Sequence, residues 1–213
     1  MYFDITHLLH YCICETFFTV IRNITTILNK LEMKALRRKK FRSLFKVFDA
    51  DRNGYLDMTD VVIIMNRFSS EFHWPKGGSA DTQFRSAFLK IWTKMFRNAD
   101  SNNDHKVSLK EFLDYYEKVT SNDFQFYANL KPFLDELFPA IDQNNDGLIS
   151  KESYCAFYRA FDNSEADAQK AFEEMDRNHD SEISHLEFYS MFYQFHMSDN
   201  PKHPSRNFFG ACA

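Results

Sequence analysis

DADRNGYLDMTD, residues 49–60, is the first of four twelve-residue stretches in this chain that are rich in Asp and Asn. The others are DSNNDHKVSLKE (100–111), DQNNDGLISKES (142–153) and DRNHDSEISHLE (176–187). Each places an oxygen-bearing side chain at positions 1, 3, 5 and 9, and a Leu, Val or Ile at position 8. Oxygens at alternate positions of a tight loop are the ligands that Ca²⁺ prefers. Four such loops in compatible registers predict calcium binding.

Apolar residues at helical spacing stand on both sides of every loop. Intervals of three and four residues are typical of an amphipathic helix. Around the first loop these residues are Phe41, Leu44, Phe45 and Phe48 before it, and Val61, Ile64 and Met65 after it. The same spacing recurs around the other loops. The sequence therefore predicts four helix–loop–helix units of the EF-hand type, with eight helices in an all-α fold.

The four units are expected to form two packed pairs. The residue at position 8 of an EF-hand loop makes a short antiparallel β contact with its partner loop. Leu56 is therefore expected to face Val107, and Ile149 to face Ile183.

The spacing of the loops suggests where the chain divides. The first two loops start 51 residues apart and the last two 34, so the first pair contains an insertion at 69–83 (SSEFHWPKGGSADTQ). Pro75 and the two glycines that follow it closely are expected to break the helix there. We interpret residues 33–122 as an N-terminal EF-hand pair, and residues 123–213 as a C-terminal pair with a tail.

Residues 1–32 are an apolar extension whose role the sequence leaves open. Asp4, Glu15, Arg22 and Lys30 interrupt it, so it lacks the ~20 uncharged apolar residues that span a membrane. It also lacks the basic leader and small-residue cleavage site of a signal peptide. Three interpretations stand: an extra helix packed on the body, a peripheral membrane helix, or an extension ahead of a second initiator at Met33.

The first, second and fourth loops carry full sets of oxygen ligands. An EF-hand uses side chains at positions 1, 3, 5, 9 and 12 and the backbone carbonyl at position 7. The expected metal ligands are Asp49, Asp51, Asn53, Tyr55 (carbonyl), Asp57 and Asp60 in the first loop; Asp100, Asn102, Asp104, Lys106 (carbonyl), Ser108 and Glu111 in the second; and Asp176, Asn178, Asp180, Glu182 (carbonyl), Ser184 and Glu187 in the fourth.

Each of these loops departs from the usual pattern at one position, and in the fourth loop the departure is Ser181 at position 6. Asp60 closes the first loop in place of Glu, and its shorter side chain is expected to use one oxygen and to make Mg²⁺ more competitive there. His105 replaces the glycine at position 6 of the second loop, where a positive φ costs on the order of 1 kcal/mol. We expect Ca²⁺ at all three loops, with mixed Ca²⁺/Mg²⁺ selectivity at the first.

The third loop lacks its closing carboxylate. Its ligand positions hold Asp142, Asn144, Asp146, Leu148 (carbonyl) and Ser150. Ser153 occupies position 12, and Glu152 stands one place too early. A shifted register would move Tyr154 and Phe157 off the apolar face of the following helix. Because a bidentate carboxylate supplies two oxygens and a charge, we expect this site to be weak or empty.

Composition favours a helical protein of the cytoplasm. The net charge is −4, and glycine and proline number only five each. Cys12, Cys14, Cys155 and Cys212 form no disulfide framework, which indicates a reducing compartment. The basic run at 34–42 (KALRRKKFR) is of a kind that also binds nucleic acid or anionic membranes. Since core-type residues interrupt it at helical spacing, we interpret it as the solvated face of the first helix and expect no nucleic-acid partner.

Further features go beyond a generic EF-hand. They are the 51-residue interval, the His73-Trp74-Pro75 of the insertion, the segment FLKIWTKMF at 88–96 and the tail SRNFFG at 205–210. From residue 33 to about 210 the chain resembles the invertebrate sarcoplasmic calcium-binding proteins, and among them the calexcitin-like branch. Asp60 and the missing glycine of the second loop match that family. Its calexcitin branch tends to lose the fourth loop, whereas here the third is damaged.

The resemblance implies a compact cytosolic calcium-binding protein of muscle or neurons, with both halves around an aromatic core. We expect a monomeric calcium buffer and no enzyme, because nothing pairs a nucleophile with a base or forms a glycine-rich phosphate loop. Two alternatives stand: a calcium-triggered sensor that engages a membrane or protein partner, and a photoprotein-like binder of a luciferin.

Overall fold

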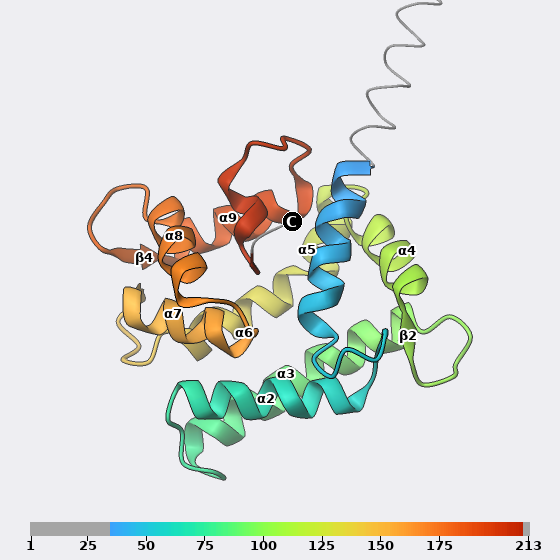
Figure 1. Cartoon of the computed structure of the whole chain (residues 1–213), viewed down its shortest axis with the longest axis horizontal. Helices are drawn as coiled ribbons and strands as arrows, with labels where there is room; N and C mark the ends of the chain where they lie inside the picture. Colours follow the sequence, from blue (N-terminus) through green and yellow to red (C-terminus); the bar gives the residue numbers. More distant parts are fainter. Residues whose placement is uncertain (1–34, 211–213) are drawn as a thin grey trace, which may run out of the picture.

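The computed structural model describes residues 35–210 (Figure 1). A helix runs through residues 35–48 of this range. It is followed by β1 (Tyr55–Leu56), α2 (Met58–Glu71), α3 (Ser79–Ala99), β2 (Val107–Ser108) and α4 (Leu109–Val119). The second half contains α5 (Asp123–Asn129), α6 (Lys131–Ile141), β3 (Leu148–Ser150), α7 (Lys151–Ala160), α8 (Glu165–Met175), β4 (Glu182–Ser184), α9 (His185–Met197) and the short 3₁₀ helix η1 (Pro204–Asn207). The apolar extension at 1–32 lies outside the described residues.

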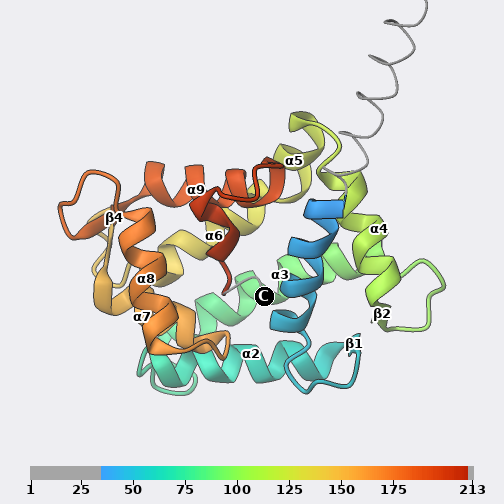
Figure 2. The same cartoon turned by 45° about the horizontal axis from the view of Figure 1, so that its top comes forward.

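The loops meet in pairs, and β2 and β4 mark the two pairs at opposite ends of the molecule (Figures 1 and 2). β1 and β2 are antiparallel, with Leu56 opposite Val107. β3 and β4 are also antiparallel, with Ile149 opposite Ile183. All four side chains are fully buried. The all-α fold of four helix–loop–helix units in two pairs, joined by short β contacts, is confirmed.

One helix was not expected. The described residues contain nine α-helices rather than the eight that the flanking patterns predict. The additional one, α5, forms where the sequence suggests a seam between the halves. The Asn122 side chain accepts a hydrogen bond from the Gln125 N–H and caps its first turn. Phe126 then anchors the helix, because its buried ring packs edge-on against Tyr193 of α9.

The insertion breaks the helix as expected, and it also reaches the other half of the molecule. α2 ends at Glu71 and α3 begins at Ser79. Between them the Trp74 ring stacks on Phe72, and its indole Nε1–H donates to the Gln143 side chain at 2.9 Å. Gln143 is position 2 of the third loop. The insertion therefore contacts the loop that has lost its closing carboxylate.

The described part of the basic run holds elements together in addition to facing solvent. Arg37 pairs with Asp199 and donates to the Thr120 carbonyl at 3.1 Å. Lys40 donates to the carbonyls of Phe195 and Ser198. These bonds join the helix at 35–48 to the end of α4 and to the end of α9. Within residues 35–210, no helix has the length and apolar character needed to cross a membrane.

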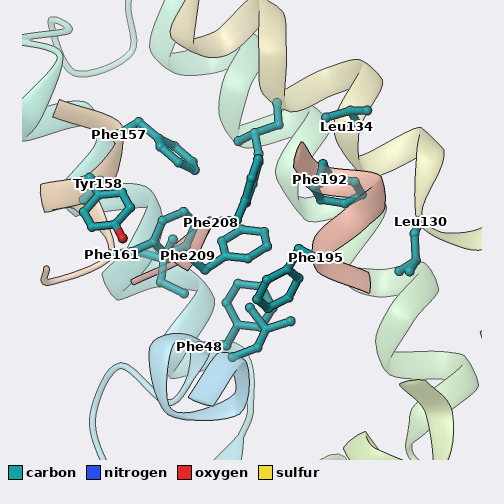
Figure 3. Close-up of a cluster of buried hydrophobic side chains, with 14 of the residues drawn as sticks. Phe48, Leu130, Leu134, Phe157, Tyr158, Phe161, Phe192, Phe195, Phe208 and Phe209 are labelled. Atoms are coloured by element: carbon teal, nitrogen blue, oxygen red, sulfur yellow. The ribbon is translucent and has the colours of Figure 1, made fainter. Parts of the chain in front are cut away.

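The C-terminal tail enters the core. Phe208 and Phe209 are buried, and Figure 3 shows their rings among Phe48, Phe161 and Phe195, which come from both halves of the chain. The tail therefore completes one continuous aromatic core rather than capping a single EF-hand pair.

Candidate metal centres

Three carboxylates converge in the first loop. Oxygens of Asp49, Asp51 and Asp60 lie within 4.8 Å of one another, close enough to share one ion. Asp60 is fully buried, and it accepts hydrogen bonds from the backbone N–H groups of Ala50 at 2.7 Å and Asp57 at 2.8 Å. The position-12 carboxylate thus accepts hydrogen bonds from the backbone at positions 2 and 9, and these bonds close the loop.

The turn at position 6 has the same geometry in all four loops. The N–H at this position donates to the position-1 carboxylate at 3.0 to 3.1 Å, from Gly54, His105, Gly147 and Ser181. The bond requires a positive φ, which glycine adopts without cost. His105 (φ 65°) and Ser181 (φ 71°) adopt it as well. The missing glycines therefore leave the loop geometry intact.

A second positive φ occurs at position 4 of every loop, and the sequence interpretation missed it. The residues are Arg52, Asn103, Asn145 and His179, with φ between 57° and 61°. Asn tolerates this conformation better than most residues, so the two Asn residues were the available signal. Arg and His at the other two positions gave no comparable indication of a positive φ.

The position-1 aspartates of the other loops have the unsatisfied oxygens that a cation site needs. The Oδ1 atoms of Asp100, Asp142 and Asp176 are buried and have no hydrogen-bond partner among residues 35–210. A buried carboxylate oxygen without a partner is costly, and a cation ligand would remove that cost. The residues present therefore fit a calcium ion.

Positions 3 and 5 are also brought together in each loop. The side-chain amide at one position donates to the carboxylate at the other at 2.7 to 2.9 Å, in the pairs Asp51 and Asn53, Asn102 and Asp104, Asn144 and Asp146, and Asn178 and Asp180. Position 7 comes next, at or just before the strand of each loop: Tyr55, Lys106, Leu148 and Glu182.

The glutamates at position 12 of the second and fourth loops accept backbone hydrogen bonds from both halves of their loops. Glu111 accepts from the Ser101 N–H at 3.1 Å and the Ser108 N–H at 3.0 Å. Glu187 accepts in the same way from Arg177 and Ser184, each at 3.0 Å. Burial opposes the ionisation of Glu111, but the bonds from Ser108 and Ser101 outweigh it and lower the pKa of Glu111 to about 2. The same balance lowers the pKa of Glu187.

The third loop is closed differently. Ser153 at position 12 turns its hydroxyl to the Ser150 hydroxyl, 3.1 Å away, and its N–H donates to the same oxygen. Since Asp142 and Gly147 keep the geometry of the other loops, the third loop differs from them chiefly at position 12.

Placing a carboxylate at position 12 of the third loop is expected to restore Ca²⁺ binding there. The Ser153→Glu variant should bind one more Ca²⁺ than the wild type, with at least about tenfold higher affinity at the third loop, because it regains a charge and two oxygens. The Gly147 amide resonance during Ca²⁺ titration measures this directly. Ser153→Gln, which adds length without charge, should gain much less. Equal gains would show that the missing carboxylate is not the cause.

Acid is expected to affect the first loop before the second and fourth. Burial raises the pKa of Asp60 despite the backbone hydrogen bonds that it accepts, whereas the pKa values of Glu111 and Glu187 are lowered. A ligand must be deprotonated to bind the ion, so protons compete at a higher pH for Asp60. As the pH is lowered, the affinity reported by the Gly54 amide should therefore begin to fall at a higher pH than the affinity reported by the His105 amide. A parallel fall would contradict this ordering.

Comparison with known proteins places the chain in a family. The model of the EF-hand domain pair matches residues 38–117 and 131–193. The chain therefore belongs to the EF-hand family, whose loops bind calcium. No curated protein sequence matches it.

Solved structures share its fold at low sequence identity. The coelenterazine-binding protein of Renilla muelleri, in a calcium-loaded apo form, is 18% identical with a TM-score of 0.69, over 84% of this chain and 97% of that one. A Streptomyces coelicolor calcium-binding protein is 20% identical with a TM-score of 0.65, over 75% and 97%. An amphioxus sarcoplasmic calcium-binding protein, from the family that the sequence resembles, is 18% identical with a TM-score of 0.64, over 83% and 97%.

Proposed function

We propose that this protein is a monomeric calcium buffer of the cytoplasm that binds Ca²⁺ at its first, second and fourth loops. The observation that supports it most is the closure of these loops. In each, a position-12 carboxylate is fixed between the first and second halves of the loop. The third loop, which lacks this carboxylate, would contribute little to Ca²⁺ binding.

The chain's own side chains fix the coordination at each site. Position 1 presents a carboxylate oxygen, positions 3 and 5 are held against each other, and position 12 joins both ends of the loop. A bound ion would neutralise these charges. At the first loop, Asp60 offers a shorter closing carboxylate than Glu, which supports competition by Mg²⁺ there.

The packing of the core supports a buffer more than it supports a sensor. A sensor opens a methionine-rich groove for its partner when calcium binds. Here Met65, Met175 and Met191 are buried, and the tail rings close the interior. Met58, at the start of α2, is exposed. The packing of α2 on α7 and of α3 on α6 ties the two halves together, which opposes independent opening of either.

Retention on a phenyl-agarose column separates these two functions. A buffer should elute alike in Ca²⁺ and in EGTA, because it exposes no new apolar groove. Calcium-dependent retention would instead support a sensor with a membrane or protein partner.

The volume of the apolar pocket argues against the photoprotein-like alternative. Ligand pockets for small organic molecules usually measure about 300–1,000 Å³, whereas the apolar pocket lined by Phe48, Trp92 and Phe209 measures about 50 Å³. We propose no catalytic role for this chain.

A further inference from the structure

The third loop lacks a hydrogen bond that the other three loops share. In those loops the position-12 carboxylate accepts from the backbone N–H at position 2, at 2.7 to 3.1 Å, from Ala50, Ser101 and Arg177. Ser153 at position 12 of the third loop bonds to Ser150 instead. Another group therefore has to hold Gln143, at position 2, for the third loop to keep the shape of the others.

The Gln143 side chain is held at both ends. Its Oε1 accepts from the Trp74 indole Nε1–H at 2.9 Å, and its Nε2 donates to the Ala140 carbonyl at 2.8 Å. Ala140 belongs to α6, the helix that leads into the third loop, whereas Trp74 belongs to the insertion of the first EF-hand pair. The start of the third loop is thus tied to its own helix and to the other half of the molecule.

The backbone of the insertion is itself fixed at the end of α2. A positive φ of 53° at His73 turns the chain, and the Trp74 N–H donates to the Ser69 carbonyl at 2.9 Å. Further along, Asp81 accepts from the Gly77 N–H at 2.9 Å and from the Ser69 hydroxyl. Trp74 therefore stands on a short, hydrogen-bonded turn.

Aromatic contacts fix the plane of the Trp74 indole. It stacks on Phe72 at 5.1 Å and 19°, and lies 5.3 Å from the ring of Phe84. Phe68, which is fully buried, stacks on both of these rings, at 5.9 and 4.6 Å. The core of the first half thus orients the N–H group that reaches the third loop.

The third loop in turn positions ligands of the fourth. Its strand β3 pairs with β4, with Leu148 opposite Ser184 and Ser150 opposite Glu182. Glu182 and Ser184 are positions 7 and 9 of the fourth loop, and both are expected ligands. A displacement of the third loop would therefore displace two ligands of its partner, and a less ordered site binds more weakly.

We propose that Trp74 replaces the missing position-12 carboxylate of the third loop. By holding Gln143, it keeps the third loop in the geometry of the other loops, and the third loop then serves as a support for Ca²⁺ binding at the fourth. Trp74 is in this sense a positioning residue for an ion that it does not touch. The role rests on the proposed Ca²⁺ site of the fourth loop.

The Trp74→Phe variant of the full chain tests the proposal. It keeps a ring against Phe72 and Phe84 but removes the N–H donor. In EGTA, hydrogen exchange of the Gly147 amide should become about threefold faster, because loss of one hydrogen bond favours local opening of the loop. In Ca²⁺ titration, the affinity reported by the Ser181 amide of the fourth loop should fall about threefold, while that reported by His105 of the second loop stays unchanged.

A second variant separates positioning from general packing. Ser153→Glu supplies the carboxylate that closes the other loops, so in that background Trp74→Phe should change neither the Gly147 exchange rate nor the Ser181 affinity. Gln83→Ala is the matched control in the insertion. Gln83 lines the same surface hollow as Trp74, of about 200 Å³, but bonds to Ser79, so its loss should leave both readouts at the wild-type values.

The proposal is overturned if Trp74→Phe leaves the Gly147 exchange and the Ser181 affinity unchanged. It is equally overturned if the losses are as large in the Ser153→Glu background, which would show that Trp74 acts through packing alone. A wild-type fourth loop that takes up no Ca²⁺ would instead refute the proposed function, and the Gly147 exchange in EGTA would then decide whether Trp74 holds the third loop.

Discussion

The Glu187→Gln variant is expected to bind one Ca²⁺ fewer than the wild type in calorimetric titration. Glu187 closes the fourth loop by accepting N–H bonds from Arg177 and Ser184. An amide keeps the size of the side chain but loses its charge and one of its two acceptor oxygens. The loss of a charged ligand costs about 3 kcal/mol, so affinity at this loop should fall about 100-fold.

A matched substitution in the same loop provides the control. Glu182 stands at position 7, where the backbone carbonyl is the expected ligand, so Glu182→Gln also removes one charge but no ligand. It should retain the full number of ions with only a small loss of affinity from long-range charge. If the two variants weaken the loop equally, Glu187 acts through general electrostatics and not as a ligand.

The Phe192→Ala variant is expected to lose about 4 kcal/mol of unfolding free energy. The Phe192 ring is 1% exposed. It lies 5.5 Å from the Phe208 ring, 6.2 Å from Phe209 and 6.0 Å from Phe126. Truncation leaves a cavity where α9, α5 and the tail meet. Urea denaturation in EGTA measures the change without the contribution of bound ions.

Phe124→Ala is the control for this stability measurement. Because the Phe124 ring is 76% exposed, its loss should change the unfolding free energy by no more than about 0.5 kcal/mol. A loss below about 1 kcal/mol for Phe192→Ala would mean that the shared aromatic core does not hold the tail to α9 and α5.

The parts of this fold that repeat could be predicted from the sequence. Each loop carries its ligand pattern and its position-8 apolar residue within twelve residues, so the pairing of Leu56 with Val107 and of Ile149 with Ile183 follows from local spacing. The missing carboxylate at Ser153 is equally local. Short-range regularity of this kind needs no knowledge of tertiary packing.

Structural features outside the repeated loop pattern could not be predicted in this way. α5 depends on an Asn122 cap and on Phe126 finding Tyr193, which is 67 residues later in the chain. The bond between Trp74 and Gln143 also joins distant segments. The depth of the tail in the core reflects its packing against rings from both halves. No periodic pattern encodes these contacts, so sequence spacing alone left α5 as a seam and the tail as a terminus.

Calorimetric titration of the full chain with Ca²⁺, with and without millimolar Mg²⁺, tests the central claim most directly. The loop geometry predicts three Ca²⁺ per chain, with Mg²⁺ competing at one of them, the loop closed by Asp60. Four equivalent sites that Mg²⁺ leaves unaffected would contradict the account, because neither Ser153 nor Asp60 would then limit its loop.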